Sequence, residues 1–188
     1  MRESGLRCVL VYMSRPLTKQ MGCPVNGYDF FTNSEFNSAW LLENLASQFL
    51  TENSSTAVNS LSVFIKNNES SVKVDFIRHN YPILSPMVTV GKIRLFSLED
   101  LAAMKLNAIA NRGAKKDFFD IYALLSHFSL AELTAFFEEK YQTMNSFTVG
   151  KSLAYFDDAE LEPDPISLMD ISWQEIKTVI TSKLRDAF

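Results

Sequence analysis

The chain reads RLFSLEDLAAMKLNAIANRGAKKDFFD at residues 94–120, and within this stretch its patterning changes from strand-like to helical. Ser97 stands before two acidic residues, an arrangement that caps a helix and suits its dipole. Apolar residues then recur at helical spacing as far as Arg112, and Gly113 is a typical residue just beyond a helix end. The pattern predicts one helix ending at Arg112 and a second over residues 114–128.

A lysine lies within the apolar stripe of the first of these helices. Leu101 precedes Lys105 by four positions and Ile109 follows it by four, so the three side chains share one face. An unpaired ammonium group is costly to bury. Lys105 must therefore pair with a carboxylate, line a cavity, or extend its stem until the charge reaches water. The sequence leaves these alternatives open.

Two carboxylates interrupt the nearly apolar second helix. Asp117 and Asp120 are three positions apart, on neighbouring turns of one side. Beside an inward lysine they could bind a metal–nucleotide, orient a substrate hydroxyl, or neutralise Lys105 in a buried ion-pair network. The junction of the two helices also carries three basic residues, which form a helix-end charge cluster or, beside such a site, a phosphate contact: Arg112, Lys115 and Lys116.

The first half of the chain carries strand patterns around one amphipathic helix. Apolar or alternating runs predict strands at residues 8–12, 28–31, 61–66, 71–77 and 93–96. Turn-type residues join the third and fourth runs, which indicates a β-hairpin. Asn37 is placed to cap a helix with an apolar face of Leu41, Leu45 and Phe49. The polar residues 51–59 are typical of a connection.

Further helix signals continue to the C-terminus. Ser129 and Ser172 each precede a Glu three positions on, which is the capping-box pattern of a helix start. Another helix is predicted over residues 146–156. We therefore expect an α+β protein with an α/β domain at residues 1–96 and a helical bundle at residues 97–188.

Asp29 and Asp75 are candidates for a pair of metal ligands. Asp29 begins an aromatic pair in one predicted strand, and Asp75 lies on the polar face of another. Phosphoryl transfer uses carboxylates that hold Mg²⁺ against a triphosphate. The two carboxylates can share an ion only if their strands are neighbours in the sheet. A merely solvated Asp75 is the alternative.

Composition excludes several classes of protein. A net charge of −4 argues against a broad basic surface for nucleic acid, although not against a small local patch. Cys8 and Cys23 lack the number and spacing of a disulfide framework or a zinc site. No apolar run approaches the roughly 20 residues that cross a bilayer. We expect a cytoplasmic protein with no membrane partner.

Residues 94–120 closely resemble the AbiEii/AbiGii toxin-type nucleotidyltransferases. Weaker similarity lies in Lys73–Phe76 and Ser152–Glu160, and the resemblance extends from about Tyr28 to the C-terminus. It implies a nucleotidyltransferase-like fold, with a small mixed β-sheet flanked by helices and then a helical domain. It further implies Mg²⁺ and an NTP, tRNA or another nucleic acid as acceptor, and a cognate antitoxin. The expected setting is a bacterial toxin–antitoxin or phage-defence system.

The resemblance also implies roles for individual residues. Asp29 corresponds to the second carboxylate of the family's Asp-x-Asp metal motif, and Asp75 to a third carboxylate on an adjacent strand. These two are the predicted metal ligands, and with Lys105 they are the predicted catalytic residues. The later motifs face nucleotide and substrate in the family, and they predict the following binding residues: Lys105, Arg112, Lys116, Asp117 and Asp120.

Two departures from the family pattern support rival hypotheses. Gly27 stands where the family has its first metal carboxylate, and MSRPL at residues 13–17 replaces a Gly-rich turn that cradles phosphate. Both losses weaken the binding of Mg²⁺ and triphosphate. One rival is a catalytically inactive family member that serves as a binding or partner module. Another is a helical interaction protein whose charged centre is purely structural.

Overall fold

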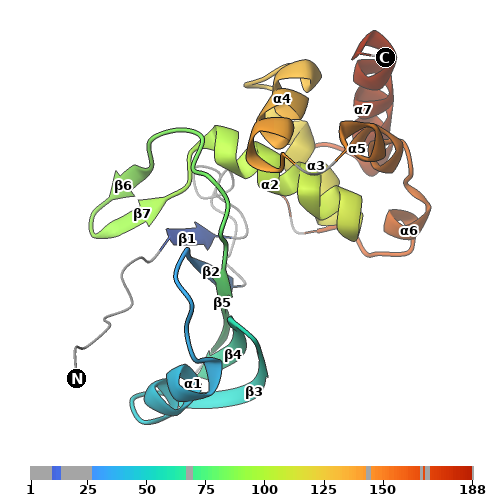
Figure 1. Cartoon of the computed structure of the whole chain (residues 1–188). Helices are drawn as coiled ribbons and strands as arrows, with labels where there is room; N and C mark the ends of the chain where they lie inside the picture. Colours follow the sequence, from blue (N-terminus) through green and yellow to red (C-terminus); the bar gives the residue numbers. More distant parts are fainter. Residues whose placement is uncertain are drawn as a thin grey trace. The chain divides into compact units, whose positions relative to one another are not determined.

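The structure is a computed structural model that describes residues 10–13, 27–66, 70–142, 145–165, 167 and 170–187 (Figure 1). The chain divides into two compact units. Described residues of the first unit lie within 10–81 and 87–96, and those of the second lie within 82–86 and from residue 97 onward. Each unit has its own hydrophobic core.

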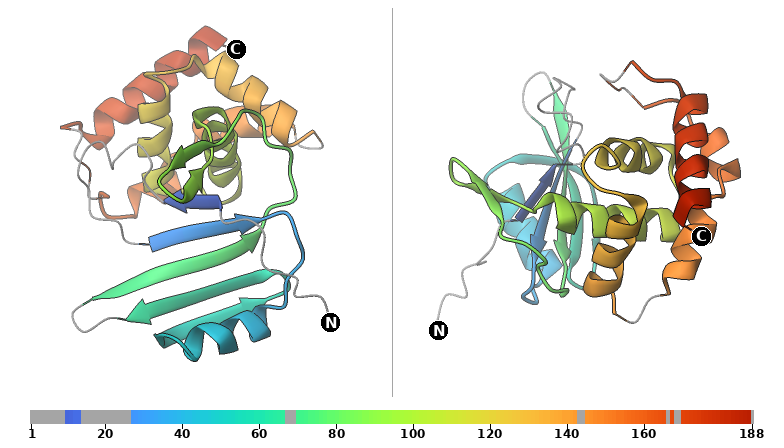
Figure 2. Two further views of the ribbon diagram at one scale, coloured as in Figure 1. Left: turned by 90° about the vertical axis from the view of Figure 1, so that its left-hand side faces the viewer. Right: turned by 90° about the horizontal axis from the view of Figure 1, so that it is seen from above.

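The first unit is built on a mixed β-sheet, seen face-on at the left of Figure 2. Its strands are β1 (Leu10–Met13), β2 (Gly27–Thr32), β3 (Leu50–Ala57), β4 (Ser60–Lys66), β5 (Ser71–Arg78), β6 (Val88–Val90) and β7 (Ile93–Leu95). They lie in the order β3-β4-β5-β2-β1-β7-β6. The pairs β2–β5 and β1–β7 are parallel, and the other neighbours are antiparallel.

Local patterns predicted most of this sheet. The predicted strands at residues 28–31, 61–66, 71–77 and 93–96 are confirmed as β2, β4, β5 and β7. The predicted hairpin is confirmed by the antiparallel pairing of β4 with β5, while its turn residues 67–69 lie outside the described residues. The strand expected at residues 8–12 overlaps β1, and Cys8 likewise lies outside the described residues.

The prediction for residues 51–59 is wrong, because most of them belong to β3. This strand lies at an edge of the sheet and exposes most of its side chains, so it carries no apolar alternation to reveal it. The preceding helix, α1 (Ser38–Ala46), begins as expected with Asn37 accepting a hydrogen bond from the Trp40 N–H. It ends before Phe49, however, which is half exposed and not part of the helical face.

Helix α1 covers one face of the sheet and thereby fixes which side chains point away from it. Apolar residues of α1 pack with Leu61, Val63 and Val74, which are buried. The rings of Phe30 and Phe76 stack with 5.1 Å between their centroids and belong to the same core. Because strand side chains alternate between faces, the residues that precede these two rings lie on the opposite face of the sheet.

The second unit is helical. Its elements are α2 (Leu98–Asn111), α3 (Lys115–Leu124), α4 (Leu130–Lys140), α5 (Ser146–Leu153), α6 (Asp157–Glu160) and α7 (Trp173–Ala187). The Ser97 cap and the capping boxes at Ser129 and Ser172 are confirmed by their hydrogen bonds. Helix α2 ends at Asn111, one residue before the predicted end, and Gly113 just beyond it has a φ of 57°, the left-handed conformation expected after a helix. Helix α3 is shorter than predicted and ends at Leu124.

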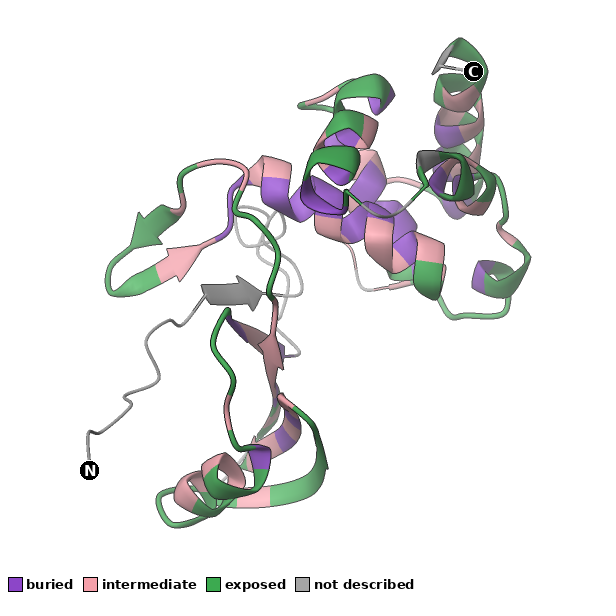
Figure 3. Cartoon of the chain, in the orientation of Figure 1, coloured by how far each residue is buried: buried purple, intermediate pink, exposed green. Residues whose placement is uncertain are grey.

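The core of the helical unit is rich in aromatic residues. Buried positions concentrate on α2 and α3, as the purple segments of Figure 3 show. Phe118 and Phe119 of α3 both pack against Trp173 at the start of α7. None of the described helices is long and apolar enough to cross a membrane.

A fully buried ion pair ties α2, α4 and residues 82–86 together. Lys140 Nζ lies 2.6 Å from Asp100 Oδ1 and donates a hydrogen bond to the Pro82 carbonyl at 2.7 Å. The Asp100 carboxylate also accepts hydrogen bonds from the backbone N–H groups of Leu84 and Ser85. These donors compensate for burying the charge. The partners are far apart in sequence, and the pair was not predicted.

Candidate active site

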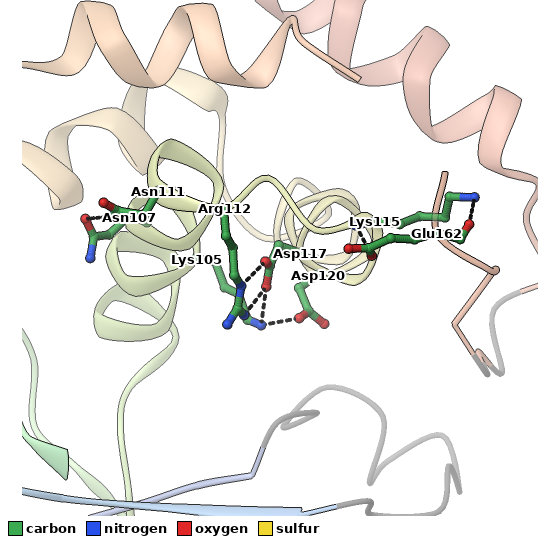
Figure 4. Close-up of polar contacts among 8 residues, drawn as sticks. All are labelled: Lys105, Asn107, Asn111, Arg112, Lys115, Asp117, Asp120 and Glu162. Atoms are coloured by element: carbon green, nitrogen blue, oxygen red, sulfur yellow. Dashed lines mark hydrogen bonds and ion pairs between the residues drawn. The ribbon is translucent and has the colours of Figure 1, made fainter. Parts of the chain in front are cut away.

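The charged centre of the helical unit joins α2 to α3 (Figure 4). Lys105 Nζ lies 3.2 Å from Asp117 Oδ1 and 2.5 Å from Asp120 Oδ2. The Lys105 side chain is 7% exposed and that of Asp117 is fully buried, whereas Asp120 retains 15% exposure. Lys105 is therefore paired inside the unit, and the alternative in which its stem carries the charge out to water is wrong.

Arg112 completes the centre from the C-terminal end of α2. Its Nε donates a hydrogen bond to Asp117 Oδ2 at 2.8 Å, and its Nη2 donates one to Asp117 Oδ1 at 3.0 Å. This two-point contact is the strong form of an arginine–carboxylate pair. The left-handed Gly113 lets the chain turn between the helices, so that Arg112 reaches a carboxylate five residues ahead. More than half of the Arg112 side chain is exposed.

The two cations keep Asp117 ionised. Burial alone raises the pKa of the Asp117 carboxyl, but the hydrogen bond from Arg112 and the charges of Lys105 and Arg112 outweigh burial. The net result is a pKa below the ordinary value for aspartate. Two carboxylates thus face two cations, and the centre is close to electrically neutral.

Arg112, the most exposed member of this centre, lines a pocket of about 410 Å³. Arg112 and Gly113 form one wall, and Lys151, Ser152 and Tyr155 contribute to another. The buried contacts have the geometry of a structural ion-pair network. The partly exposed Arg112 and Asp120 are the groups through which a ligand would reach that network. Both interpretations of the centre therefore stay predictions.

Lys115 does not belong to this centre. Its Nζ donates a hydrogen bond to the Glu162 carbonyl at 2.5 Å, lies 3.1 Å from Asp164 Oδ1, and is 5.4 Å from the Trp173 ring centroid. The prediction that Lys115 clusters with Arg112 and Lys116 is wrong, because the first turn of α3 directs Lys115 toward Glu162. Lys116 is exposed.

The sheet unit brings the other two predicted residues together. Asp29 of β2 and Asp75 of β5 are register partners on adjacent parallel strands, so the condition for a shared ion is met. Both lie on the face opposite α1, because they alternate with the stacked Phe30 and Phe76. The side chain of Ser62, the register partner of Asp75 on β4, hydrogen-bonds to the Asp75 carboxylate.

A lysine holds the Asp75 carboxylate in its ionised form. Lys73 Nζ lies 2.7 Å from Asp75 Oδ2. Burial raises the pKa of Asp75, but the hydrogen bonds from Lys73 and Ser62, together with the Lys73 charge, bring the net pKa below its ordinary value. Neither Lys73 nor Ser62 was predicted as a site residue. The signal for Lys73 was its place two residues before Asp75, on the same strand face.

Comparison with known proteins identifies the chain's family. A family model described as "Nucleotidyl transferase AbiEii toxin, Type IV TA system" matches residues 41–187. The chain belongs to the AbiEii family. The expected family is thus confirmed, and the match contains every predicted site residue except Asp29.

Individual proteins resemble this AbiEii-family chain in sequence or in fold. An uncharacterised Aquifex aeolicus protein is 31% identical over 119 residues, which is 61% of this chain and 57% of that protein. The crystal structure of JHP933 from Helicobacter pylori has a TM-score of 0.58 at 14% identity, covering 94% of this chain and 82% of that one. A candidate nucleotidyltransferase from H. pylori has a TM-score of 0.54 at 14% identity, covering 96% and 89%. The expected α+β, nucleotidyltransferase-like fold is confirmed.

The carboxylate pair fits Mg²⁺ that arrives with a nucleotide. Mg²⁺ is commonly held by one or two carboxylates together with water and substrate phosphates. Asp29 and Asp75 supply two carboxylates in adjacent register. Within the described part of the chain, no group of three or more His, Cys, Asp or Glu side chains could hold a metal. The described residues thus offer Mg²⁺ two adjacent carboxylates and no larger donor set.

Gly27 marks a close approach of β2 to β5. It is the register partner of Lys73, and a Cβ at position 27 would lie 2.9 Å from the Lys73 carbonyl oxygen. No real Cβ tolerates that distance, so a side chain at position 27 requires the two strands to shift. The strand spacing at this point therefore fits a glycine and no residue with a side chain.

Proposed function

We propose that this AbiEii-family protein transfers a nucleotide from Mg²⁺-bound NTP to a nucleic-acid acceptor, with tRNA as the first candidate. The observation that carries the proposal is the pairing of Asp29 with Asp75 in one register of adjacent strands. We place this activity in the bacterial cytoplasm, as the toxin of a toxin–antitoxin or phage-defence system whose antitoxin restrains it.

Different residues have different roles in the proposed reaction. Bound Mg²⁺ would supply charge neutralisation and alignment of the triphosphate oxygens. Asp29 and Asp75 would hold the ion, and the lowered pKa of Asp75 keeps that carboxylate charged at neutral pH. Lys105, Asp117 and Asp120 would form the centre that faces phosphate and the nucleotide or acceptor, which a ligand would reach through the partly exposed Asp120 and Arg112. The exposed cations of Arg112 and Lys116 are suited to phosphate oxygens.

One observation favours a second candidate, an inactive family member that binds a partner or nucleotide without transferring it. Gly27 supplies no carboxylate, and the crowding at its Cβ position opposes restoring one. Two metal carboxylates in place of three lower the charge available to hold Mg²⁺. The two candidates differ in catalysis and not in fold.

Binding is tested first, by thermal unfolding with ATP, GTP, CTP or UTP in the presence of Mg²⁺. A ligand bound only by the folded state raises its stability by about 2.7 kcal/mol at 100 times Kd. We expect one NTP to raise the Tm and Asp75→Asn to abolish the rise. Glu52→Gln, an exposed carboxylate on the same sheet, is the matched control and should leave the rise unchanged. Absence of a rise with all four NTPs would refute the transferase.

Transfer is tested next, by incubating the protein with total tRNA and the stabilising NTP carrying an α-phosphate label. The transferase proposal expects labelled tRNA with the wild-type protein and none with Asp75→Ala or Lys105→Ala. Binding of NTP without transfer to tRNA or other RNA would favour the inactive family member.

A further inference from the structure

Lys73 contacts one of the two carboxylate oxygens of Asp75, a predicted metal ligand. It lies two residues before Asp75 on the same strand face, with its Nζ 2.7 Å from Asp75 Oδ2. The Lys73 side chain is 45% exposed, whereas that of Asp75 is 18% exposed. The ammonium group therefore reaches the carboxylate from the solvent side, along a flexible stem.

The charge of Lys73 opposes the binding of a divalent ion. Asp29 and Asp75 stand in adjacent register, and the ammonium charge of Lys73 offsets the charge of the Asp75 carboxylate. An ammonium group and a metal ion compete for the same oxygen lone pairs and repel each other at close range. Metal affinity follows the charge count of the ligands, so this site is weaker than its two carboxylates alone would be.

The position directly beside Lys73 on the neighbouring strand holds no side chain. The register partner of Lys73 on β2 is Gly27, which has no side chain to pair with an ammonium group. An ideal Cβ at position 27 would lie 3.3 Å from the Lys73 Cβ, so any side chain there would be in direct contact with Lys73. The same glycine that omits a metal carboxylate thus leaves the Lys73 charge directed at Asp75.

We propose that Lys73 is an internal cation that a divalent metal ion must displace from Asp75. The inference rests on the proposed function in taking Asp29 and Asp75 as the metal ligands. Without nucleotide, Lys73 keeps the affinity for free metal low. With nucleotide, the displaced ammonium group finds phosphate oxygens within reach of its stem, so metal and NTP bind cooperatively. Lys73 therefore makes the binding of metal depend on the binding of nucleotide.

The test measures binding of Mn²⁺ alone to the full chain, from the loss of the free-ion electron paramagnetic resonance signal. Mn²⁺ takes the same oxygen ligands as Mg²⁺. Lys73→Met removes the charge and keeps a long stem, and it should tighten Mn²⁺ binding about tenfold. Lys73→Arg keeps the charge and should bind as weakly as the wild type. Lys66→Met is the control, because Lys66 pairs with Glu52 at 3.1 Å with similar exposure on the same sheet.

The outcomes separate this inference from the proposed function. Tighter binding in Lys73→Met, lost again when Asp75→Asn is added, supports the displaced cation. Equal Mn²⁺ affinity in the wild type and Lys73→Met would overturn it, as would an Arg variant that binds like the Met variant. Neither result depends on NTP binding or on transfer to tRNA, which the Tm and labelling experiments decide. Unchanged thermal unfolding of each variant without metal shows that the fold is intact.

Discussion

Asp117 shows most clearly how one residue stabilises the helical unit. Its buried carboxylate is contacted by the ammonium of Lys105 and, at two points, by the guanidinium of Arg112. Removing Asp117 would leave the buried Lys105 with Asp120 as its remaining carboxylate and Arg112 without its two-point contact. Asp117 therefore connects α2 to α3 whether or not a substrate also uses the site.

Asp117→Asn should destabilise the protein at neutral pH by about 2–4 kcal/mol, because Lys105 and Arg112 lose the charge that compensates them. The loss should shrink in acid. Because the pKa of Asp117 is lowered in the folded state, its stabilisation is complete above the unfolded pKa of about 3.9. It disappears as pH falls through the lower folded value. Urea unfolding at pH 7, 4 and 3 measures the gap between wild type and variant.

The matched control is Glu35→Gln, which removes an exposed carboxylate paired with Arg78 and should cost less than about 1 kcal/mol. A gap between wild type and Asp117→Asn that stayed constant down to pH 3 would show that the Asp117 charge is not what stabilises the folded state.

Helices and strands were predicted correctly where the residues that specify them are close together in the sequence. Caps at Asn37, Ser97 and Ser129 were predictable because the side chain and its backbone partner lie within three residues. The β4–β5 hairpin was predictable because strand alternation and turn residues are adjacent in sequence. Strand β3 was missed because an exposed edge strand needs no apolar residues.

The candidate site was predictable only in part, for the same reason. Asp29 and Asp75 could be named individually, but their pairing depends on β2 joining β5, two strands that are not consecutive in the sequence. The contact of Ser62 with Asp75 likewise follows from strand register. The apolar stripe of its helix showed that Lys105 points inward. Whether its ammonium group pairs with a carboxylate, lines a cavity or reaches water depends on where α3 lies, which the sequence does not give.

The spacing of β2 and β5 predicts the effect of placing a carboxylate at position 27. Gly27→Ala and Gly27→Asp should each destabilise the protein by about 1–3 kcal/mol, because a Cβ at position 27 would crowd the Lys73 carbonyl. Thermal and urea unfolding measure the cost, and the Ala variant separates sterics from charge. A Gly27→Asp variant that was as stable as wild type while the Ala variant was not would contradict the steric account.

The buried ion pair of Lys140 with Asp100, between α2 and α4, supports a second prediction. Lys140→Met should cost about 3–5 kcal/mol, since it leaves the Asp100 carboxylate buried without its cation. Adding Asp100→Asn removes the uncompensated charge but keeps a side-chain acceptor for the N–H groups of Leu84 and Ser85. The double variant should therefore lose less stability than the sum of the single variants, as measured by urea unfolding. Additive losses would show that the two charges are not coupled.

At the scale of the whole molecule, the charge balance limits how the protein can hold an acceptor. With 18 basic and 22 acidic residues the net charge is −4, which argues against a broad basic surface for nucleic acid. The helical unit nevertheless places the cations of Arg112 and Lys151 around one pocket, with Lys116 exposed on the adjoining helix. For the proposed nucleic-acid acceptor, so small a patch matches a short single strand, such as the end of an RNA, better than a duplex.

This balance predicts a weak dependence of tRNA binding on salt. Three phosphate contacts correspond to a slope of log affinity against log salt of about −2 to −3, whereas a broad basic surface gives much steeper slopes. Fluorescence anisotropy of labelled tRNA over a series of KCl concentrations measures the slope. Lys116→Ala should reduce its magnitude by a little less than one, while Lys92→Ala, in the β6–β7 turn, should leave it unchanged. A slope steeper than about −5 would mean that a larger basic surface forms on binding, and the three-cation patch would then be insufficient to account for recognition of the acceptor.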